Sequence, residues 1–387
     1  MKGVKRWDAI IIGAGIIGVS LAIELDKRGL RVLVVEKGKP GREASWAAGG
    51  MLADFPLEMP VALRELATAS ARMYPEFVHE LEDESRMRID LRDQGTLLFA
   101  DPAKLVAPHD SSLAALRGNS CTFPKPLLEL EAHLAPDNIA RLTGLFLQER
   151  SVDPRHLTAA AIAAAKHREI DFSSGNHVLA VEVEDGGAAG VRTNKSQFAA
   201  GIVVNCAGAW AGEIGREVIG GKDAALVQAE RGSGGFLPLP TRPVKGQMLC
   251  VAMPEKELVR HVIRTPDVYL IPRSDGRMLI GATQEESGFD KQTIPQTIQK
   301  LRREALDLVP KLAEARFLEA WAGLRPGTPD ALPILGATET RGYYVATGHF
   351  RDGILLAPVT ARVMGQVIAG ENPGFDLTAF GTARFRN

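Results

Sequence analysis

Residues 9–18 read AIIIGAGIIG, in which an apolar run breaks into three closely spaced glycines. We expect a buried strand, a tight turn at Gly13, a close approach of backbone to a pyrophosphate at Gly15, and close packing of the following helix on the strand at Gly18. The helix predicted over residues 16–27 would point its N-terminal amides at that phosphate. The stretch therefore predicts a Rossmann-like unit that binds a dinucleotide.

The next apolar run, residues 31–35, is typical of a buried parallel strand and ends at Glu36. Glu36 lies 23 residues after Gly13, where a carboxylate that binds ribose is expected. A carboxylate there accepts hydrogen bonds from ribose hydroxyls and repels a 2′-phosphate. Strand, glycines, helix, strand and acid thus follow in the order that dinucleotide binding needs, and NADP is disfavoured.

A secretory signal is the competing interpretation of the same stretch. Lys2, Lys5 and Arg6 precede an uncharged run over residues 9–23. That run has 15 residues, three of them glycine, whereas a membrane span needs about 20, and no small-residue cleavage site follows it. We therefore expect neither a signal peptide nor a membrane anchor.

Composition is that of a globular protein with room for two domains: 387 residues, 45% hydrophobic and 24% charged. The net charge is −1 and no basic block occurs, so nucleic acid is not an expected partner. The eight histidines show no HExxH spacing, which disfavours a metal site. The three cysteines, Cys121, Cys206 and Cys250, form no CxxC pair. This disfavours a disulfide framework, a zinc site and an oxidising compartment, and we expect a cytoplasmic location.

Helix and strand patterns alternate at both ends of the chain, and strand patterns dominate its middle. We expect helices over 61–84, from Pro154 after an Asp153 cap, 295–308 and 354–368, and strands over 90–100, 178–181, 202–205, 244–251, 268–272, 278–283, 317–321 and 342–346.

These patterns predict an α/β (α+β) fold with two domains. We assign residues 1–90, 145–215 and 318–387 to a Rossmann-like cofactor domain that is discontinuous in sequence. Residues 91–144 and 216–317 are assigned to a substrate domain built on an antiparallel sheet.

A second glycine-flanked turn, GHFRDG at residues 348–353, follows a predicted strand and precedes the helix predicted over 354–368. Its backbone amides and the positive end of the helix dipole would face a ligand anion. If the ligand is a flavin, they would face the N1/C2 carbonyl side of the ring and stabilise the anion formed on reduction. The alternative is an ordinary strand–turn–helix connection.

Arg325 and Arg351 are the candidate substrate-binding arginines. The planar guanidinium matches a carboxylate with two hydrogen bonds, although most arginines are solvated surface groups. Arg325 stands out because it follows apolar residues and precedes the rigid Pro326–Gly327 turn. The phenol of Tyr269 could bind the same carboxylate, although a tyrosine on a strand is more often a packing residue.

Six segments together resemble the D-amino-acid oxidase superfamily of FAD-dependent amine oxidoreductases, and within it the glycine oxidases associated with thiamine biosynthesis. They are AIIIGAGIIG with Glu36, GREASWAAGGML at 41–52, VVNCAGAW at 203–210, VYLIPRSDGRMLIGAT at 268–283, WAGLRPGTPD at 321–330 and GHFRDGILLAP at 348–358.

The resemblance implies FAD, with its pyrophosphate near Ile16 and Ile17, its ribose at Glu36, its adenine near Val178 and its isoalloxazine near residues 349–355. The implied cofactor residues are Gly13, Gly15, Ile16, Ile17, Gly18, Glu36, Lys37, Ala44, Ser45, Gly49, Gly50, Met51, Val178, Gly208, His349, Phe350, Arg351, Asp352, Gly353, Ile354 and Leu355. The implied substrate residues are Arg325 as the carboxylate clamp, Tyr269, Arg351 and Gln284.

The chain departs from the family pattern at two places. Gln284 stands where glycine oxidases can have methionine, which predicts a more polar pocket, and the stretch 220–240 is longer than usual. Covalent flavin would need a cysteine near residues 323–328, and none is there, so non-covalent FAD is expected. The cysteines are expected in the core, Cys206 above all.

The resemblance implies oxidation of glycine, sarcosine or a small D-amino acid by hydride transfer from the neutral amine to flavin N5, with no side-chain base. Water would hydrolyse the imine to a 2-oxo acid, and oxygen would take the electrons to give hydrogen peroxide. A dehydrogenase that passes electrons to a quinone or another carrier, and a non-catalytic nucleotide-binding protein, remain alternatives. A homo-oligomer is plausible.

Overall fold

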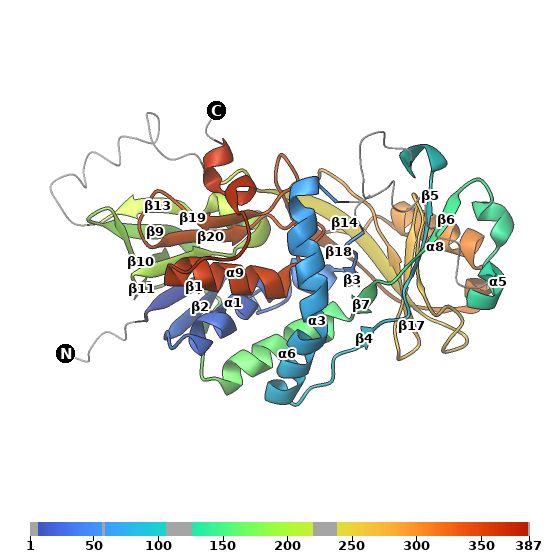
Figure 1. The fold of residues 1–387 in the computed structure, drawn as a ribbon, viewed down its shortest axis with the longest axis horizontal. Helices are drawn as coiled ribbons and strands as arrows, with labels where there is room; N and C mark the ends of the chain where they lie inside the picture. The colour runs from blue at the N-terminus through green and yellow to red at the C-terminus, as the bar shows by residue number, and fades with distance from the viewer. Residues whose placement is uncertain (1–6, 56–58, 106–125, 220–237, 386–387) are drawn as a thin grey trace.

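The computed structural model describes residues 7–55, 59–105, 126–219 and 238–385. Two lobes lie next to each other along the long axis of the molecule (Figure 1). Cys121 and most of the 220–240 stretch, on which two expectations rest, lie outside the described residues.

The first lobe is built on a six-stranded sheet that is parallel except at one edge. Its strand order is β19 (Ile334–Ala337), β20 (Tyr343–Thr347), β12 (Ile202–Asn205), β1 (Ala9–Ile12), β2 (Val32–Glu36) and β8 (Asp171–Ser174). Only β19 runs antiparallel to its neighbour among these strands. The chain leaves β1 for β2 on one side and later returns to β12 on the other. The carboxyl ends of β1 and β12 therefore border the crevice at which open α/β sheets bind ligands.

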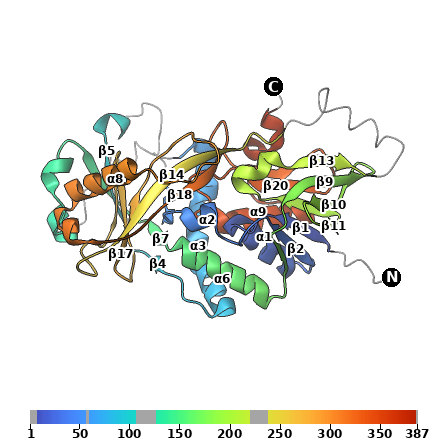
Figure 2. The ribbon, with the colours of Figure 1, turned by 180° about the vertical axis from the view of Figure 1, so that it is seen from behind.

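Helices cover one face of this sheet and a second sheet covers the other (Figure 2). The helices are α1 (Ile16–Lys27), α3 (Arg64–Ser85), α6 (Pro154–His167) and α9 (Ala357–Ala369), and the second sheet is β11 (Gln197–Ala199), β10 (Gly187–Thr193), β9 (Val178–Glu184) and β13 (Gly215–Val218). Side chains alternate along β1, so Ile11 packs in the helix-side cluster whereas Ile10 and Ile12 pack against the second sheet. Burial on both faces explains why β1 is uniformly apolar.

The second lobe is built on a seven-stranded, mostly antiparallel sheet. Its order is β18 (Arg316–Gly327), β14 (Arg242–Ala252), β17 (Arg277–Gly281), β16 (Tyr269–Pro272), β15 (Val262–Arg264), β5 (Thr96–Ala100) and β6 (Thr143–Leu147), and only β15 with β5 is parallel among these pairs. Helix α8 (Pro295–Leu308) packs its apolar side chains into the core of this lobe. The remaining short elements are α2 (Ala44–Ala47), α5 (Leu127–Leu130) and a three-stranded sheet of β3 (Met51–Leu52), β7 (Arg150–Val152) and β4 (Leu91–Arg92).

The α/β fold class is confirmed, and α1, α6 and α8 begin where the sequence predicts. Asp153 caps α6 by accepting from the backbone N–H of Arg155 at 2.9 Å. Two element predictions were wrong. The helix predicted over 354–368 begins only at Ala357, because Pro358 suits the first turn of a helix. The strand predicted over 90–100 is divided into β4 and β5, because the backbone turns at Gly95 with a φ of +94°.

The domain boundaries stay a prediction. Two of them would cut through a β-strand that is paired within a single sheet. The boundary at 317/318 falls inside β18, which pairs with β14 along nearly its whole length. The boundary at 215/216 falls inside β13, which pairs with β9 of the first lobe. Sheet membership therefore favours moving the first boundary beyond Gly327 and the second beyond Val218.

Replacement of Gly18 by alanine tests the contact between α1 and β1. A Cβ at Gly18 would lie 2.0 Å from the carbonyl oxygen of Gly13, which is backbone and cannot move aside. We expect Gly18→Ala to lower the free energy of unfolding by about 3 kcal/mol, as overpacking does, in urea titrations of the FAD-free protein.

The matched control is Gly365→Ala, a helical glycine in α9. Its Cβ would meet only the flexible Glu24 and Arg28 side chains, at 2.7 and 3.1 Å. These can shift, and alanine favours the helix by about 1 kcal/mol, so this variant should unfold within about 1 kcal/mol of the parent. Equal losses in the two variants would contradict the proposed backbone contact.

Candidate cofactor and substrate site

A cavity of about 450 Å³ runs from the glycine turn after β1 to the large sheet of the second lobe. The predicted residues that line it are Gly13, Gly15, Ile16, Ile17, Glu36, Lys37, Ala44, Ser45, Gly49, Gly50, Met51, Val178, Gly208, Tyr269, Gln284, Arg325, His349, Phe350, Arg351, Gly353 and Ile354. Gly18, Asp352 and Leu355 do not line it. Residues more than 300 positions apart in the chain thus share one cavity.

The turn between β1 and α1 leaves no room for side chains. Gly13 has a φ of +104°, and a Cβ there would lie 2.6 Å from the carbonyl oxygen of Cys206. The N–H of Ile16, at the start of α1, donates to Ser45 Oγ at 2.9 Å. The Ser45 hydroxyl therefore already accepts the hydrogen bond of the first helix amide, at the position predicted for a pyrophosphate. The glycines form a cradle that a dinucleotide fits and that a Cβ at Gly13 would disturb.

Glu36 is held rigidly at the end of β2. Its carboxylate accepts from the N–H groups of Ala14 at 2.9 Å and Gly38 at 2.8 Å, and the residue is only 8% exposed. The next side chain, Lys37, lies with its Nζ 3.0 Å from the centre of the Trp210 ring, and burial lowers the pKa of its ammonium group. The structure thus fixes Glu36 at the cavity wall, where a ribose is expected.

The GHFRDG turn, residues 348–353, lines the same cavity. His349 is 3% exposed, its Nε2 lies 3.1 Å from Thr360 Oγ1, and burial lowers the pKa of its imidazole to about 3. The imidazole is therefore neutral at physiological pH. Helix α3 holds the end of the turn, because Ser70 donates to the carbonyl of Leu355 at 2.6 Å and Tyr74 to that of Ile354.

The substrate end of the cavity contains Arg325 and Tyr269. Arg325 Nη1 on β18 donates to the carbonyls of Thr283 at 3.0 Å and Lys245 at 3.4 Å, which orients the guanidinium. Burial raises the pKa of the Tyr269 phenol, and the nearby Arg325 and Arg351 cations oppose that rise. The arrangement puts two donors, one of them charged, at one end of the cavity, as recognition of a carboxylate requires.

Glycines also make room for this clamp. A Cβ at Gly246, on β14, would lie 2.4 Å from both terminal nitrogens of Arg325. A Cβ at Gly281 would lie 2.9 Å from both Met248 and Tyr269. Sequence reasoning gave neither glycine a role, because only strand pairing reveals what faces them.

Other cavity residues were missed as well, among them Arg42, Glu43, Asn176, His177, Met248, Thr265, Pro266, Asp267 and Val268. Residues 265–268 connect β15 to β16 and contain Pro and Asp, which indicate a turn but not a ligand contact. Arg42 and Glu43 lie within the quoted GREASWAAGGML motif, so that segment could have been included as a whole.

The described residues contain neither a cluster of metal ligands nor a helix that could cross a membrane. Within them, no three side chains among His, Cys, Asp and Glu gather as metal ligands would. No helix in the same part of the chain has the length and apolarity to cross a bilayer.

Comparison with known proteins gives consistent matches along nearly the whole chain. The family model described as FAD dependent oxidoreductase (DAO) matches residues 8–367. The chain is 32% identical to the glycine oxidase of Pseudomonas aeruginosa over 394 residues, covering 97% of this chain and 98% of that protein. The crystal structure of glycine oxidase from Geobacillus kaustophilus matches with a TM-score of 0.83 at 30% identity, covering 99% of this chain and 100% of that one.

The bifunctional protein ThiO/ThiG of Trichormus variabilis is 32% identical over 388 residues. The match covers 98% of this chain but 55% of that protein, so the chain spans about half the length of this relative.

The neutral state of His349 predicts how stability changes with pH. The pKa is about 3 in the folded protein against an ordinary 6.5, so the unfolded chain binds a proton that the folded protein excludes. This contribution to stability is present above pH 6.5 and is lost as the pH falls towards 3. His349→Gln, which can still bond to Thr360, should lose about 2 kcal/mol less stability than the parent between pH 8 and pH 5, in urea titrations of the FAD-free protein. Parallel losses in both proteins would show that His349 takes up its proton in the folded state.

Proposed function

Because the chain belongs to the FAD-dependent oxidoreductase (DAO) family and is glycine oxidase-like, we propose that it oxidises a small amino acid to a 2-oxo acid. The observation that carries the proposal is the oriented Arg325 beside Tyr269 at one end of a cavity whose other end is the glycine cradle. Glycine, sarcosine and small D-amino acids are the proposed substrates. A role in thiamine biosynthesis and a homo-oligomeric state belong to the same proposal.

FAD is held, in this proposal, by Gly13, Gly15, Glu36, the loop 44–51 and the turn 348–353. When bound, it supplies the acceptor for the hydride taken from the substrate α-carbon. Attachment is non-covalent in this proposal, and burial raises the pKa of the thiols of Cys206 and Cys250, the latter to about 11. A protonated, buried thiol is a poor nucleophile, and residues 323–328 contain no cysteine.

Arg325 and Tyr269 bind the substrate carboxylate. Two carbonyls fix Nη1 of Arg325, so the guanidinium is oriented before the substrate arrives and little rotamer entropy is lost on binding. This fixed carboxylate in turn fixes the α-carbon. Orientation of this kind contributes much of the rate in a reaction that needs no side-chain base.

In this proposal the amine reacts in its neutral form, and His349 is not the base that takes its proton. His349 is neutral and bonded to Thr360, so it can accept a proton only at low pH. Water hydrolyses the imine, releasing ammonia or an amine, and oxygen is the proposed final acceptor. Gln284 lines the cavity and gives this end an amide that can bond to a polar substrate group.

Replacement of Arg325 tests the carboxylate clamp. We expect Arg325→Ala to weaken substrate binding by about 2–5 kcal/mol, since the substrate carboxylate then loses the oriented guanidinium that can donate two hydrogen bonds to it. Tyr269→Phe should cost about 1 kcal/mol, the value of one neutral hydrogen bond. The measurement is the dependence of anaerobic flavin bleaching on glycine, sarcosine and D-alanine concentration.

Arg42→Ala is the control for this series, because Arg42 lines the same cavity but lies on the first lobe near α2. It should leave the amino-acid dependence within about twofold of the parent, as an interaction worth under about 0.4 kcal/mol would. Unchanged substrate affinity in Arg325→Ala would remove the clamp from the proposal.

The same bleaching experiment tests the activity itself. We expect loss of the 450 nm flavin band on anaerobic addition of a small amino acid, and rapid recovery in air with formation of hydrogen peroxide. Recovery only on addition of a quinone would identify a dehydrogenase instead. No bleaching by any amino acid of the panel would support a non-catalytic nucleotide-binding protein.

A further inference from the structure

The loop that contains α2 and ends at β3, residues 44–51, lines the cavity with its backbone while its carbonyls are bonded on the other side. Trp321 Nε1 donates to the carbonyl of Ala47 at 3.0 Å. Arg273 Nη2 donates to that of Gly49 at 2.5 Å. Neither donor side chain lines the cavity, whereas Ala47, Ala48, Gly49 and Gly50 do. The carbonyls therefore point away from the cavity.

In a trans peptide the N–H points opposite to the C=O of the same peptide unit. The N–H of Gly50 is consequently directed to the opposite side of the loop from Arg273, towards the cavity, and the same holds for the N–H of Ala48 opposite Trp321. The donors behind the loop thus decide which backbone groups a bound cofactor meets.

Gly49 lies at the reacting end of the cavity and not at its nucleotide end. A Cβ at Gly49 would lie 2.7 Å from Ile271, 3.6 Å from Tyr269 and 3.7 Å from Met248. Tyr269 is also the neighbour of Arg325. The peptide that Arg273 holds therefore lies beside the proposed substrate site.

The guanidinium of Arg273 is costly to bury, and the hairpin that carries it does not satisfy it. The residue is 1% exposed, and its Nε and Nη1 have no hydrogen-bond partner among the described residues. Burial lowers its pKa to about 10, so it remains a cation at neutral pH. Burying this cation with one good hydrogen bond costs free energy, and packing the hairpin against the loop does not by itself require a charged side chain there.

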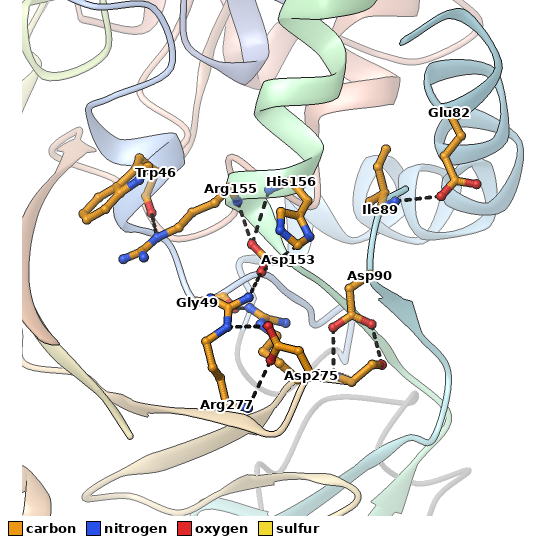
Figure 3. A network of polar contacts seen from close by, with 12 residues as sticks. Trp46, Gly49, Glu82, Ile89, Asp90, Asp153, Arg155, His156, Asp275 and Arg277 are labelled. Atoms are coloured by element: carbon orange, nitrogen blue, oxygen red, sulfur yellow. Dashed lines mark hydrogen bonds and ion pairs between the residues drawn. The ribbon is translucent and has the colours of Figure 1, made fainter. Parts of the chain in front are cut away.

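The neighbouring charges have other partners. Asp153 caps α6 and pairs with Arg277 at 2.8 Å, and Asp90 accepts from the N–H of Ser274 at 3.0 Å (Figure 3). These carboxylates are the nearest negative charges to Arg273, and Arg277 and Arg92 oppose them. Asp153 and Asp90 therefore stabilise the charge of Arg273, but among the described residues neither carboxylate forms an ion pair with it.

We propose that Arg273 is a positioning residue for the cofactor: it turns the Gly49–Gly50 peptide so that its N–H is directed to the cavity in which FAD would be held, and its positive charge behind that peptide would favour the reduced, anionic flavin. The inference rests on the proposed placement of FAD in this cavity. It does not depend on which amino acid is oxidised. Fixed dipoles and charges directed at developing negative charge act most strongly where water is excluded.

Arg273→Gln tests the proposal, with Arg273→Lys as the variant that keeps the charge. The readouts are the dissociation constant of FAD, from fluorescence titration of the FAD-free protein, and the midpoint potential of the bound flavin, from dye equilibration; neither needs a substrate. We expect Arg273→Gln to bind FAD about tenfold more weakly, as loss of a charged hydrogen bond does, and to have a more negative potential. Arg273→Lys should keep the potential of the parent.

Arg277→Gln is the matched control, because it lies on the same hairpin and loses its ion pairs with Asp153 and Asp275 without touching the loop. It should leave the potential unchanged even if it lowers the melting temperature. An unchanged potential in Arg273→Gln, or equal shifts in Arg273→Gln and Arg277→Gln, would overturn the proposal. If Arg273→Gln does not fold, Arg273→Lys must still bind FAD more weakly than Arg277→Lys, and equal affinities would overturn it.

Failure of the proposed function gives a different result. If no amino acid bleaches the flavin, the FAD affinity and the potential of these variants are still measured, so the role of Arg273 is decided independently of the substrate.

Discussion

The contact between Gly18 and the carbonyl of Gly13 is the constraint on which the cofactor site depends. A Cβ at Gly18 would lie 2.0 Å from that oxygen, so only glycine lets α1 approach β1 this closely. The resulting turn lets Glu36 accept from the N–H of Ala14 and brings Cys206, at the end of β12, against Gly13. One close helix–strand contact therefore aligns the ends of three strands around a single crevice.

Elements with strong local signals could be predicted from the sequence. Local residue types account for these elements: glycines for the turn after β1, and the Asp153 cap with Pro154 for the start of α6. Burial on both faces accounts for the apolar strands β1, β2 and β12. The late start of α9 and the break between β4 and β5 were missed, because a proline and a glycine were each compatible with two local structures. Strand pairing decides the second case, because β4 pairs with β7 whereas β5 pairs with β6 and β15; Pro358 in the first turn of α9 decides the first.

The candidate site divides in the same way. Its cofactor residues lie in contiguous motifs, so nearly all of those predicted line the cavity. The substrate end depends on register: Arg325 meets the carbonyls of Lys245 and Thr283 only because β18 pairs with β14 and β14 with β17. The roles inferred for Gly246 and Arg273 also depend on strand pairing within this sheet. Periodicity within one segment contains no information about which segment will lie opposite.

The charges around the reacting end suit a reaction that builds negative charge on the cofactor and needs no protein base. Arg325 and Arg351 lie near Tyr269, Arg273 lies behind Gly49, and the buried imidazole of His349 is neutral. Arg325 and Arg273 are held by backbone carbonyls, so in the proposed reaction they need not reorganise when negative charge develops on the cofactor. The positive field of these three arginines also disfavours a protonated, positively charged amine on the substrate α-carbon. In the proposed reaction this field would favour an amino acid whose amine is neutral, since the ammonium form cannot release a hydride.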